Sequence, residues 1–398
     1  MIEFVKYPPK LALCDNVMRI EVATDLPSNT EGGVSIEVTI FDAADQILGA
    51  DVLYPILPGS ASMDMSEYIR SMMFTPRQFT FPEQGNIPWN PKTGLIKEYK
   101  IKCQEIYADA PSPLLTTIWL YYHYAVRGKI PNWIKSEFYS KWTSFSQWLV
   151  NEKAFLTFSP KTLVTTPTQM QKLFLPIWWV PENNEKLNLK VKVGFTDGTS
   201  GSFTTGQQTG NITQNTIIEF GVSAPLLSIL FWTETNHPGK TAAYYTVTAM
   251  FGEIERSETR TYLLDYDDHL SDHQFIFANS PGGYDTFVAT GIRELNSDFK
   301  FVNVSQQNPD VSPLADRKQL SVESSDVLVC RTGFMDAPMA EYMAEFFESS
   351  ERYEVVGSRL IPIVLRDAKM TRKTDDENMF FIQFEYEHAL TQIIEAEQ

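Results

Sequence analysis

Two histidines in an acidic stretch come closest, by type and spacing, to metal-binding chemistry. Residues 265–273 read Asp-Tyr-Asp-Asp-His-Leu-Ser-Asp-His, which places His269 and His273 four residues apart among four aspartates. On a helix both imidazoles would lie on one face, where they could bind a divalent metal ion. The stretch lacks the glutamate of an H-E-x-x-H motif, and its surroundings predict a turn between two strands. We therefore interpret it as a solvated acidic loop.

A second group of carboxylates lies on a predicted helix. Glu341, Glu345 and Glu348 recur at helical spacing, and hard cations prefer carboxylate oxygens as ligands. An acidic helix face exposed to water has the same pattern and is much commoner. We adopt that interpretation and predict no metal-binding residue.

The residue patterns of nucleophilic catalysis are missing from the sequence. It has no G-x-S-x-G motif, and its five histidines occur in no triad-like motif. Cys103 stands between Lys102 and Gln104 in a predicted strand, where an inward-facing, inert thiol is expected. The paired carboxylates of glycosidases cannot be recognised from spacing alone. We predict no catalytic residue, no cofactor-binding residue and no cofactor, and hence a protein that is not an enzyme.

Tryptophan-rich patches raise the possibility of sugar binding, because exposed aromatic rings stack on ligands. The patches are Trp119 with its neighbouring tyrosines, the pair Trp142 and Trp148, and the pair Trp178 and Trp179. In β-proteins most such residues belong to the core. We expect these to be core residues and keep carbohydrate binding as an alternative.

Composition limits the remaining functions. The 398 residues carry a net charge of −17, which repels nucleic-acid phosphates and anionic membrane surfaces, so we predict no direct nucleic-acid binding. No run approaches 18 apolar residues, so we predict no membrane span. Three widely spaced cysteines (Cys14, Cys103, Cys330) predict neither a disulfide framework nor a zinc knuckle. The first residues lack a signal-peptide pattern, which favours synthesis in the cytoplasm.

The strands that must position any site dominate the chain, and we predict a mainly β fold with tandem β-sandwich-like domains. Residues 1–130 form the first sandwich, with apolar residues alternating along 34–41. Residues 131–185 form a crossing segment with a short helix. Residues 186–281 form a second sandwich, whose Asp-Gly turn and later long strands repeat the first in outline. This outline suggests an internal duplication.

Residues 282–398 are predicted to form an acidic C-terminal α+β domain. A helix is expected over residues 338–348, with Asp336 as its cap and Pro338 in its first turn. Before this domain, residues 275–291 predict two strands joined by a turn at Asn279-Ser-Pro-Gly-Gly283, which would mark the passage from one β-domain to the next. A ligand-cradling loop is the alternative, but no phosphate-binding motif accompanies it.

Several short phrases, taken in order, resemble a family of uncharacterised structural proteins that phages and prophages of gut bacteria encode. They occupy residues 60–69, 124–129, 155–160, 189–199, 277–287, 349–350, 361–364 and 381–386. The resemblance implies a subunit of the tail or baseplate region of a virion, made in the host cytoplasm. It implies no catalytic residues.

Our leading hypothesis is therefore a structural subunit of the tail, baseplate or connector region of a phage or phage-like particle. Its partners would be copies of itself and other particle proteins. Loops at 82–92, 198–215 and 305–318 are candidates for ordering on assembly. The alternative is a carbohydrate-binding or adhesin-like β-sandwich protein, although an exported adhesin should have a signal peptide. A third hypothesis, a β-sandwich hydrolase, requires two facing carboxylates in a cleft.

Overall fold

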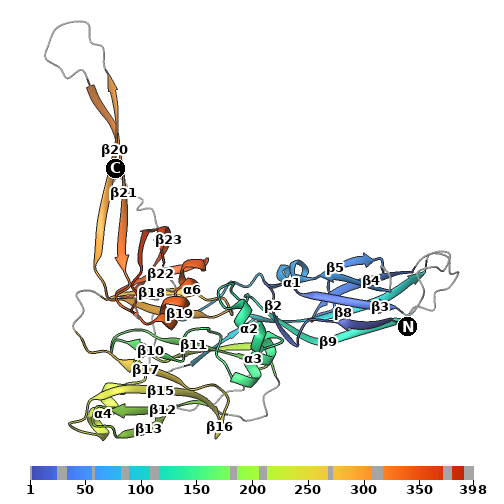
Figure 1. The fold of residues 1–398 in the computed structure, drawn as a ribbon, viewed down its shortest axis with the longest axis horizontal. Coiled ribbons are helices and arrows are strands. Elements are labelled where there is room, and N and C mark those ends of the chain that lie inside the picture. Colours follow the sequence, from blue (N-terminus) through green and yellow to red (C-terminus); the bar gives the residue numbers. More distant parts are fainter. Residues whose placement is uncertain are drawn as a thin grey trace. The chain divides into compact units, whose positions relative to one another are not determined.

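The protein is mainly β, as the sequence predicts (Figure 1). The computed structural model describes residues 2–24, 34–55, 59–81, 89–107, 116–179, 186–205, 213–267, 272–305, 317–370 and 379–389. Strands account for 52% of the structure and helices for 13%, so the predicted fold class is confirmed. By internal contacts the chain divides into unit 1, Met1–Tyr266 with Phe277–Thr286, and unit 2, Asp267–Ile276 with Phe287–Gln398. The finer boundaries predicted from the sequence stay predictions.

The first module of unit 1 consists of two sheets that share one core. The five-stranded sheet has the order β2-β9-β8-β4-β5, with bounds Leu11–Leu13, Thr117–Val126, Ile96–Tyr107, Val34–Asp42 and Ile47–Leu53. The three-stranded sheet has the order β1-β3-β6, with bounds Ile2–Lys6, Arg19–Thr24 and Ser60–Asp64. Ile36, Val38 and Ile40 are fully buried, as their alternation predicts, and Ile20 and Val22 enter the same core from the other sheet.

The second module of unit 1 repeats this arrangement. The main path of its larger sheet is β10-β17-β15-β12-β13, with bounds Thr162–Thr165, Arg260–Leu264, Ala242–Phe251, Leu187–Phe195 and Ser200–Thr204. A short strand, β16 (Ile254–Glu255), pairs with β15. In each module the first strand of this order pairs in parallel with the next, β2 with β9 and β10 with β17. The following pairs are antiparallel in both modules. The shared topology supports the predicted internal duplication.

The smaller sheet of the second module takes one strand from an earlier part of the chain. Its order is β11-β14-β7, with bounds Lys172–Ile177, Thr216–Gly221 and Trp89–Thr93. The antiparallel pair β11–β14 corresponds to β3–β6 of the first module. Strands β7 and β13 occupy parts of the segments 82–92 and 198–215 that we expected to be loops, so that expectation is wrong at those residues. Residues 82–88, 206–212 and 306–316 lie outside the described residues.

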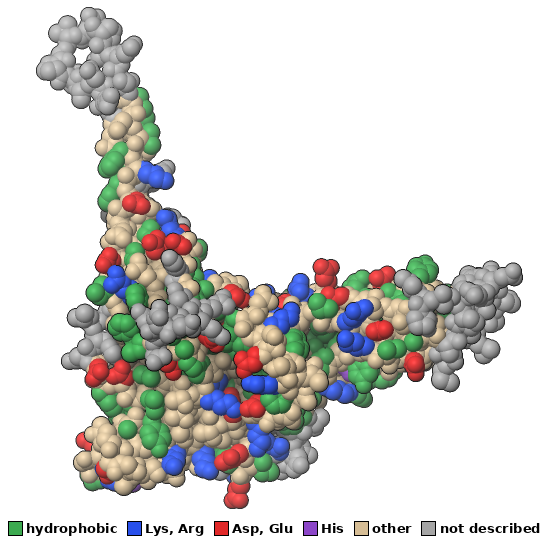
Figure 2. Space-filling model, in the orientation of Figure 1, with side chains coloured by type: hydrophobic (Ala, Val, Ile, Leu, Met, Phe, Trp, Pro, Cys, Tyr) green, Lys and Arg blue, Asp and Glu red, His purple; other side chains and the backbone are tan. Residues whose placement is uncertain are grey.

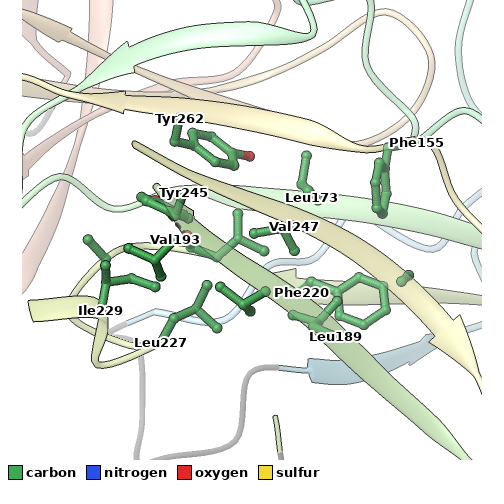
Figure 3. Packing of buried hydrophobic residues seen from close by; sticks show 14 of the residues in the cluster. Phe155, Leu173, Leu189, Val193, Phe220, Leu227, Ile229, Tyr245, Val247 and Tyr262 are labelled. Atoms are coloured by element: carbon green, nitrogen blue, oxygen red, sulfur yellow. Dashed lines mark hydrogen bonds between the residues drawn. The ribbon is translucent and has the colours of Figure 1, made fainter. Parts of the chain in front are cut away.

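The core of the second module lies between its two sheets (Figure 3). Val193, Tyr245 and Val247 contribute from the larger sheet, and Leu173 and Phe220 from the smaller one. All five side chains are buried. Strand β11 lies within residues 131–185, which we predicted to be a crossing segment. All six of its residues are buried, as in a strand that is covered on both faces of its sheet.

Four short helices complete the described part of unit 1. They are α1 (Ser66–Ser71), α2 (Lys135–Lys141), α3 (Phe145–Glu152) and α4 (Ile229–Asn236). The helix expected near Trp142 to Leu149 is α3, and its N-cap Ser144 accepts a hydrogen bond from the Gln147 N–H at 3.2 Å. No helix in the described ranges is long and apolar enough to cross a membrane.

Unit 2 is built on the strands of one seven-stranded sheet. Its order is β19-β18-β22-β23-β24-β21-β20, with bounds Tyr284–Ala289, His273–Ala278, Arg352–Val356, Arg359–Lys369, Gln383–His388, Arg317–Arg331 and Arg293–Ser305. Strands β20 and β21 form an antiparallel ribbon that extends beyond the rest of this sheet (Figure 1).

The single helix predicted over 338–348 is two short helices, α5 (Ala337–Tyr342) and α6 (Ala344–Glu348). The expected cap is present, because the Asp336 carboxylate accepts a hydrogen bond from the Met339 N–H at 3.0 Å. The helix is interrupted at Met343, whose side chain is fully buried.

The turn at residues 279–283 joins β18 and β19, so the predicted strand–turn–strand element is confirmed. The Asn279 carboxamide oxygen accepts a hydrogen bond from the Gly283 N–H at 2.7 Å, which closes the turn. Gly282 has φ +108°, and a Cβ there would lie 2.6 Å from the Arg127 carbonyl oxygen. The Ser280 carbonyl accepts a hydrogen bond from the Lys129 N–H at 2.9 Å. The turn therefore packs backbone against backbone, and Gly282 is required both by its conformation and by the lack of space.

We expect Gly282→Ala to lower the free energy of unfolding by about 3 kcal/mol, because it adds a steric clash with a carbonyl to backbone strain. Gly198→Ala is the matched control: its φ is +82°, yet no atom lies within 4 Å of the added Cβ, so about 1 kcal/mol should be lost. Urea unfolding followed by tryptophan fluorescence measures both. Equal losses in the two variants would contradict the close-packing argument.

Candidate functional site

The two histidines of the acidic stretch have different outcomes. His269 lies outside the described residues, whereas His273 is the first residue of β18. Its Nδ1 lies 3.7 Å from an oxygen of Glu354 on β22. No group of three or more histidine, cysteine, aspartate or glutamate side chains in the described ranges is arranged to hold a metal ion. His273 is thus part of a buried polar cluster in unit 2.

Glu354 is the centre of that cluster. Its side chain is 2% exposed, and its oxygens lie 2.5 Å from Nη1 of Arg293 and 2.8 Å from Nε2 of His388. The Tyr386 hydroxyl donates a hydrogen bond to it at 3.0 Å. A carboxylate in β22 therefore ties together β18, β20 and β24. Sequence reasoning missed it, although a glutamate among the apolar residues of 353–356 was a signal.

The chemistry of the Glu354 cluster favours a fixed structural role. Burial lowers the pKa of His273, and the nearby Arg293 lowers it further. Burial raises the pKa of Tyr386, and the Glu354 charge adds to the effect. The Glu354 carboxylate is buried and its oxygens are held by Arg293, His388 and Tyr386, so it is not presented to a substrate.

Unit 1 contains a second buried carboxylate, Glu219 on β14. Lys172 Nζ lies 2.7 Å from one of its oxygens and Lys92 Nζ lies 3.1 Å from the other. The Thr80 N–H donates to both oxygens at 2.9 Å. Burial acts to raise the pKa of Glu219, but Lys172, Thr80 and Lys92 outweigh it and hold the pKa below its usual range. This group fixes β7, β11 and β14 to one another.

The remaining polar candidates are structural as well. Glu345 is only 2% exposed, so the interpretation of residues 341–348 as a solvated acidic face is wrong at its central member. Cys103 is fully buried, as predicted, and burial raises the pKa of its thiol to about 12. Cys14 and Cys330 are also buried free thiols. A thiol held in its protonated form is a poor nucleophile.

The tryptophan patches separate into core and surface residues. Trp148 is buried against Phe138, Phe145 and Phe158, as expected of a core residue. Trp179 is partly buried and packs against the core of the second module.

Trp119 contradicts the expectation of a core residue, because its side chain is 38% exposed. It stacks on Tyr121, which is 44% exposed, with ring centroids 5.3 Å apart and planes at 14°. Phe41 on β4 extends this group, with its centroid 5.5 Å from that of Trp119. We call Phe41, Trp119 and Tyr121 the aromatic face. Its position was readable from the alternation, since Ile118 and Leu120 pack on the core and their neighbours must point outward.

A lysine and a strained tyrosine border the aromatic face. Lys102 on β8 is the cross-strand neighbour of Trp119 and lies between it and Thr39. Tyr122 has φ +59° and is 64% exposed, at the point where the β8–β9 register shifts. A bulky residue in the left-handed region carries backbone strain, and such a bulge re-aims the side chain.

The β20–β21 ribbon is the largest concentration of exposed apolar side chains in the described residues. Figure 2 shows hydrophobic side chains along it. Phe299 and Phe301 are 57% and 59% exposed, and Leu320 is 64% exposed. Leu295, Val302, Val304 and Val322 add to the same ribbon. In the described sheet only β21 flanks β20, so the ribbon has no second strand beside β20. We call residues 293–305 and 317–326 the arm.

Comparison with known proteins finds no protein-family model and no curated sequence that matches this chain.

His123 on β9 is a buried histidine, with only 1% of its surface exposed. It packs edge-on against Tyr7 and Tyr99, and neither ring nitrogen has a hydrogen-bond partner in the described part of the protein. Burial, with a smaller effect of Lys10, lowers its pKa from 6.5 to about 4. The folded protein therefore disfavours the protonated ring.

We expect His123 to make the protein less stable in mild acid. Between pH 6.5 and 4 the unfolded chain binds the proton and the folded chain does not, so stability present above pH 6.5 is lost as the pH falls, by up to about 3 kcal/mol. His123→Phe keeps the ring packing and removes the titration. As the pH is lowered from 8 to 4.5, the free energy of unfolding should fall more in the wild-type protein than in the variant. A difference that does not change with pH would contradict this account.

Proposed function

We propose that this chain is a structural subunit of a phage or phage-like particle, in its tail, baseplate or connector region. It acts by oligomerisation and by docking to neighbouring proteins. The observation that supports oligomerisation and docking is the arm. Large apolar side chains on an exposed two-stranded ribbon are unfavourable in water unless another surface covers them.

The physical argument rests on the arm's exposed surface. A two-stranded ribbon in water is marginally stable and presents strand edges that can pair with other chains. Single exposed hydrophobic residues are ordinary, but a contiguous group marks an interaction surface. Phe299 and Phe301 lie on one face of the ribbon with ring centroids 6.5 Å apart, and exposed Val322 is the cross-strand partner of Phe301. Burial of this group on a partner would stabilise the association through the hydrophobic effect.

Other properties of the chain agree with a role that depends on shape. Two modules of the same topology present several separate sheet surfaces. The buried Glu219 and Glu354 clusters fix strands rather than offer reactive groups. The resemblance to phage structural proteins is the reason for proposing a particle, and it implies a location in the virion after synthesis in the host cytoplasm.

We expect the purified chain to form oligomers that depend on the arm. Phe299→Ser with Phe301→Ser should shift the mass toward the monomer, because two aromatic side chains that bury at an interface are replaced by polar ones. Size-exclusion chromatography with light scattering measures the mass, and negative-stain images show any ring or tube. Phe231→Ser on α4 is the control, because Phe231 is 70% exposed but lies outside the arm.

The place of the protein in a particle needs its own test. A tagged chain expressed in a producing host should sediment with the particles and be labelled on them by gold-conjugated antibody. Particles that contain none of the chain would contradict the virion role, whatever its oligomeric state.

A second candidate function, carbohydrate binding, is favoured by the aromatic face. Stacked, exposed Trp119 and Tyr121 on a β-sheet offer the apolar surface on which a sugar ring packs, and Lys102 beside them can donate hydrogen bonds.

For this second function we expect binding on a glycan array that Trp119→Ala reduces at least about tenfold, because the largest ring of the face is removed. Trp178→Ala is the matched tryptophan control outside the face. An array without signal, or equal binding by both variants, would exclude the aromatic face as a sugar site.

A further inference from the structure

The outer edge of β20 has the features of a strand that pairs with a second copy of itself. β20 is the last strand of its sheet, so in the described part of unit 2 one edge faces β21 and the other faces no strand. Residues 294–304 are all exposed. The strand is regular, because the register shift of the ribbon falls on β21, where Leu320 is the extra residue. A long, regular edge of this kind is a template for strand addition.

The charges of β20 favour one register for pairing with itself. In an antiparallel pair, two residues directly opposite each other have their side chains on the same face of the sheet. When a two-fold axis perpendicular to the sheet relates the two copies, this requires the axis to pass between the two copies of one residue, so that this residue lies opposite itself. Phe299 is the middle of Arg293–Ser305, and an axis there pairs the whole strand with its copy. In that register Asp298 of each chain lies opposite Lys300 of the other, which gives two ion pairs of opposite charge.

Neighbouring registers are less favourable. An axis at Asp298 places two aspartates opposite each other, and an axis at Lys300 places two lysines opposite each other; like charges in these positions are destabilising. An axis at Ser297 brings Lys300 opposite Glu294 but leaves residues 302–305 beyond the end of the partner strand. Full overlap and charge together select the register centred on Phe299.

We infer that the arm's partner is a second copy of this chain, bound by antiparallel pairing of β20 with β20 around Phe299. This inference rests on the proposed assembly role and identifies one contact within it. Pairing joins two ribbons into a four-stranded sheet with the order β21-β20-β20-β21. The N–H and C=O groups along the two joined β20 edges form hydrogen bonds with each other, and the Phe299 rings of the two chains become neighbours.

Reversing one charge at a time tests the register. When two Asp298→Lys chains pair, the introduced lysine of each lies opposite Lys300 of the other. When two Lys300→Asp chains pair, the introduced aspartate of each lies opposite Asp298 of the other. Each variant alone should raise the dissociation constant of the dimer about tenfold or more, since two attractive contacts become repulsive. The effect should diminish in high salt.

Mixing the two single variants provides a sharper test. In a mixed dimer the two lysines of one chain lie opposite the two aspartates of the other, so the mixture should recover wild-type affinity while each variant alone stays weak. Analytical ultracentrifugation, or native mass spectrometry that separates the two masses, measures this. Recovery also shows that both variants fold.

The outcomes separate this inference from the broader function. Weak single variants and a restored mixture support the pairing. Oligomers that are insensitive to both reversals but lost with Phe299→Ser and Phe301→Ser would overturn the β20 pairing and leave the assembly role standing. A wild-type chain that stays monomeric would overturn the pairing, while the particle-labelling experiment would still decide the virion role.

Discussion

Close backbone contact at residues 279–283 is the constraint on which unit 1 depends most. Gly282 faces the Arg127 carbonyl, a Cβ on Gly283 would lie 2.9 Å from the Leu156 carbonyl, and Asn279 donates a hydrogen bond to that same carbonyl at 2.7 Å. Three segments far apart in the sequence thus meet where two of the positions admit no side chain. Such a contact requires small residues and satisfied hydrogen bonds at once, which few sequences provide.

Buried polar groups continue from this turn into unit 1. The Asp285 carboxylate accepts hydrogen bonds from Asn279 and from the Thr157 hydroxyl, both at 2.8 Å. Together with the Glu219 cluster, this arrangement gives unit 1 two polar centres that tolerate only one register of the surrounding strands. Burying charges costs free energy even when they are paired, so their contribution here is specificity of structure more than stability. The Glu354 cluster has the same role in unit 2.

The sequence was a good guide to the strands and a poor guide to the partners of buried charges. Alternation along 34–41, the Asp-Gly turn after Phe195 and the turn at 279–283 are local signals, and each predicted element is present. Glu354 and His273 could not be paired in advance, because their meeting depends on how distant strands align. The break of the helix at Met343 was missed for a related reason: tertiary packing overrides helical periodicity. Trp119 was misassigned because composition was weighed above the parity of its neighbours.

The arm was missed for a different reason. Residues 293–305 alternate like a half-buried strand, and nothing local shows that neither face is covered. Exposure of this kind is a property of the whole sheet, and only the described strand order reveals it. Its charges could be read from the sequence, but their pairing has meaning only once β20 is known to be an edge.

Strand β7 has a consequence for how the chain is made. Residues 89–93 complete a sheet with β14, whose residues are synthesised about 125 residues later. At usual elongation rates the ribosome needs roughly 6–25 s to cover that interval. During this time the nascent N-terminal half carries an unpaired strand while its own module can already close. Chaperone binding to nascent chains should therefore be concentrated on this segment, and protein fragments cut between the modules would be prone to aggregation.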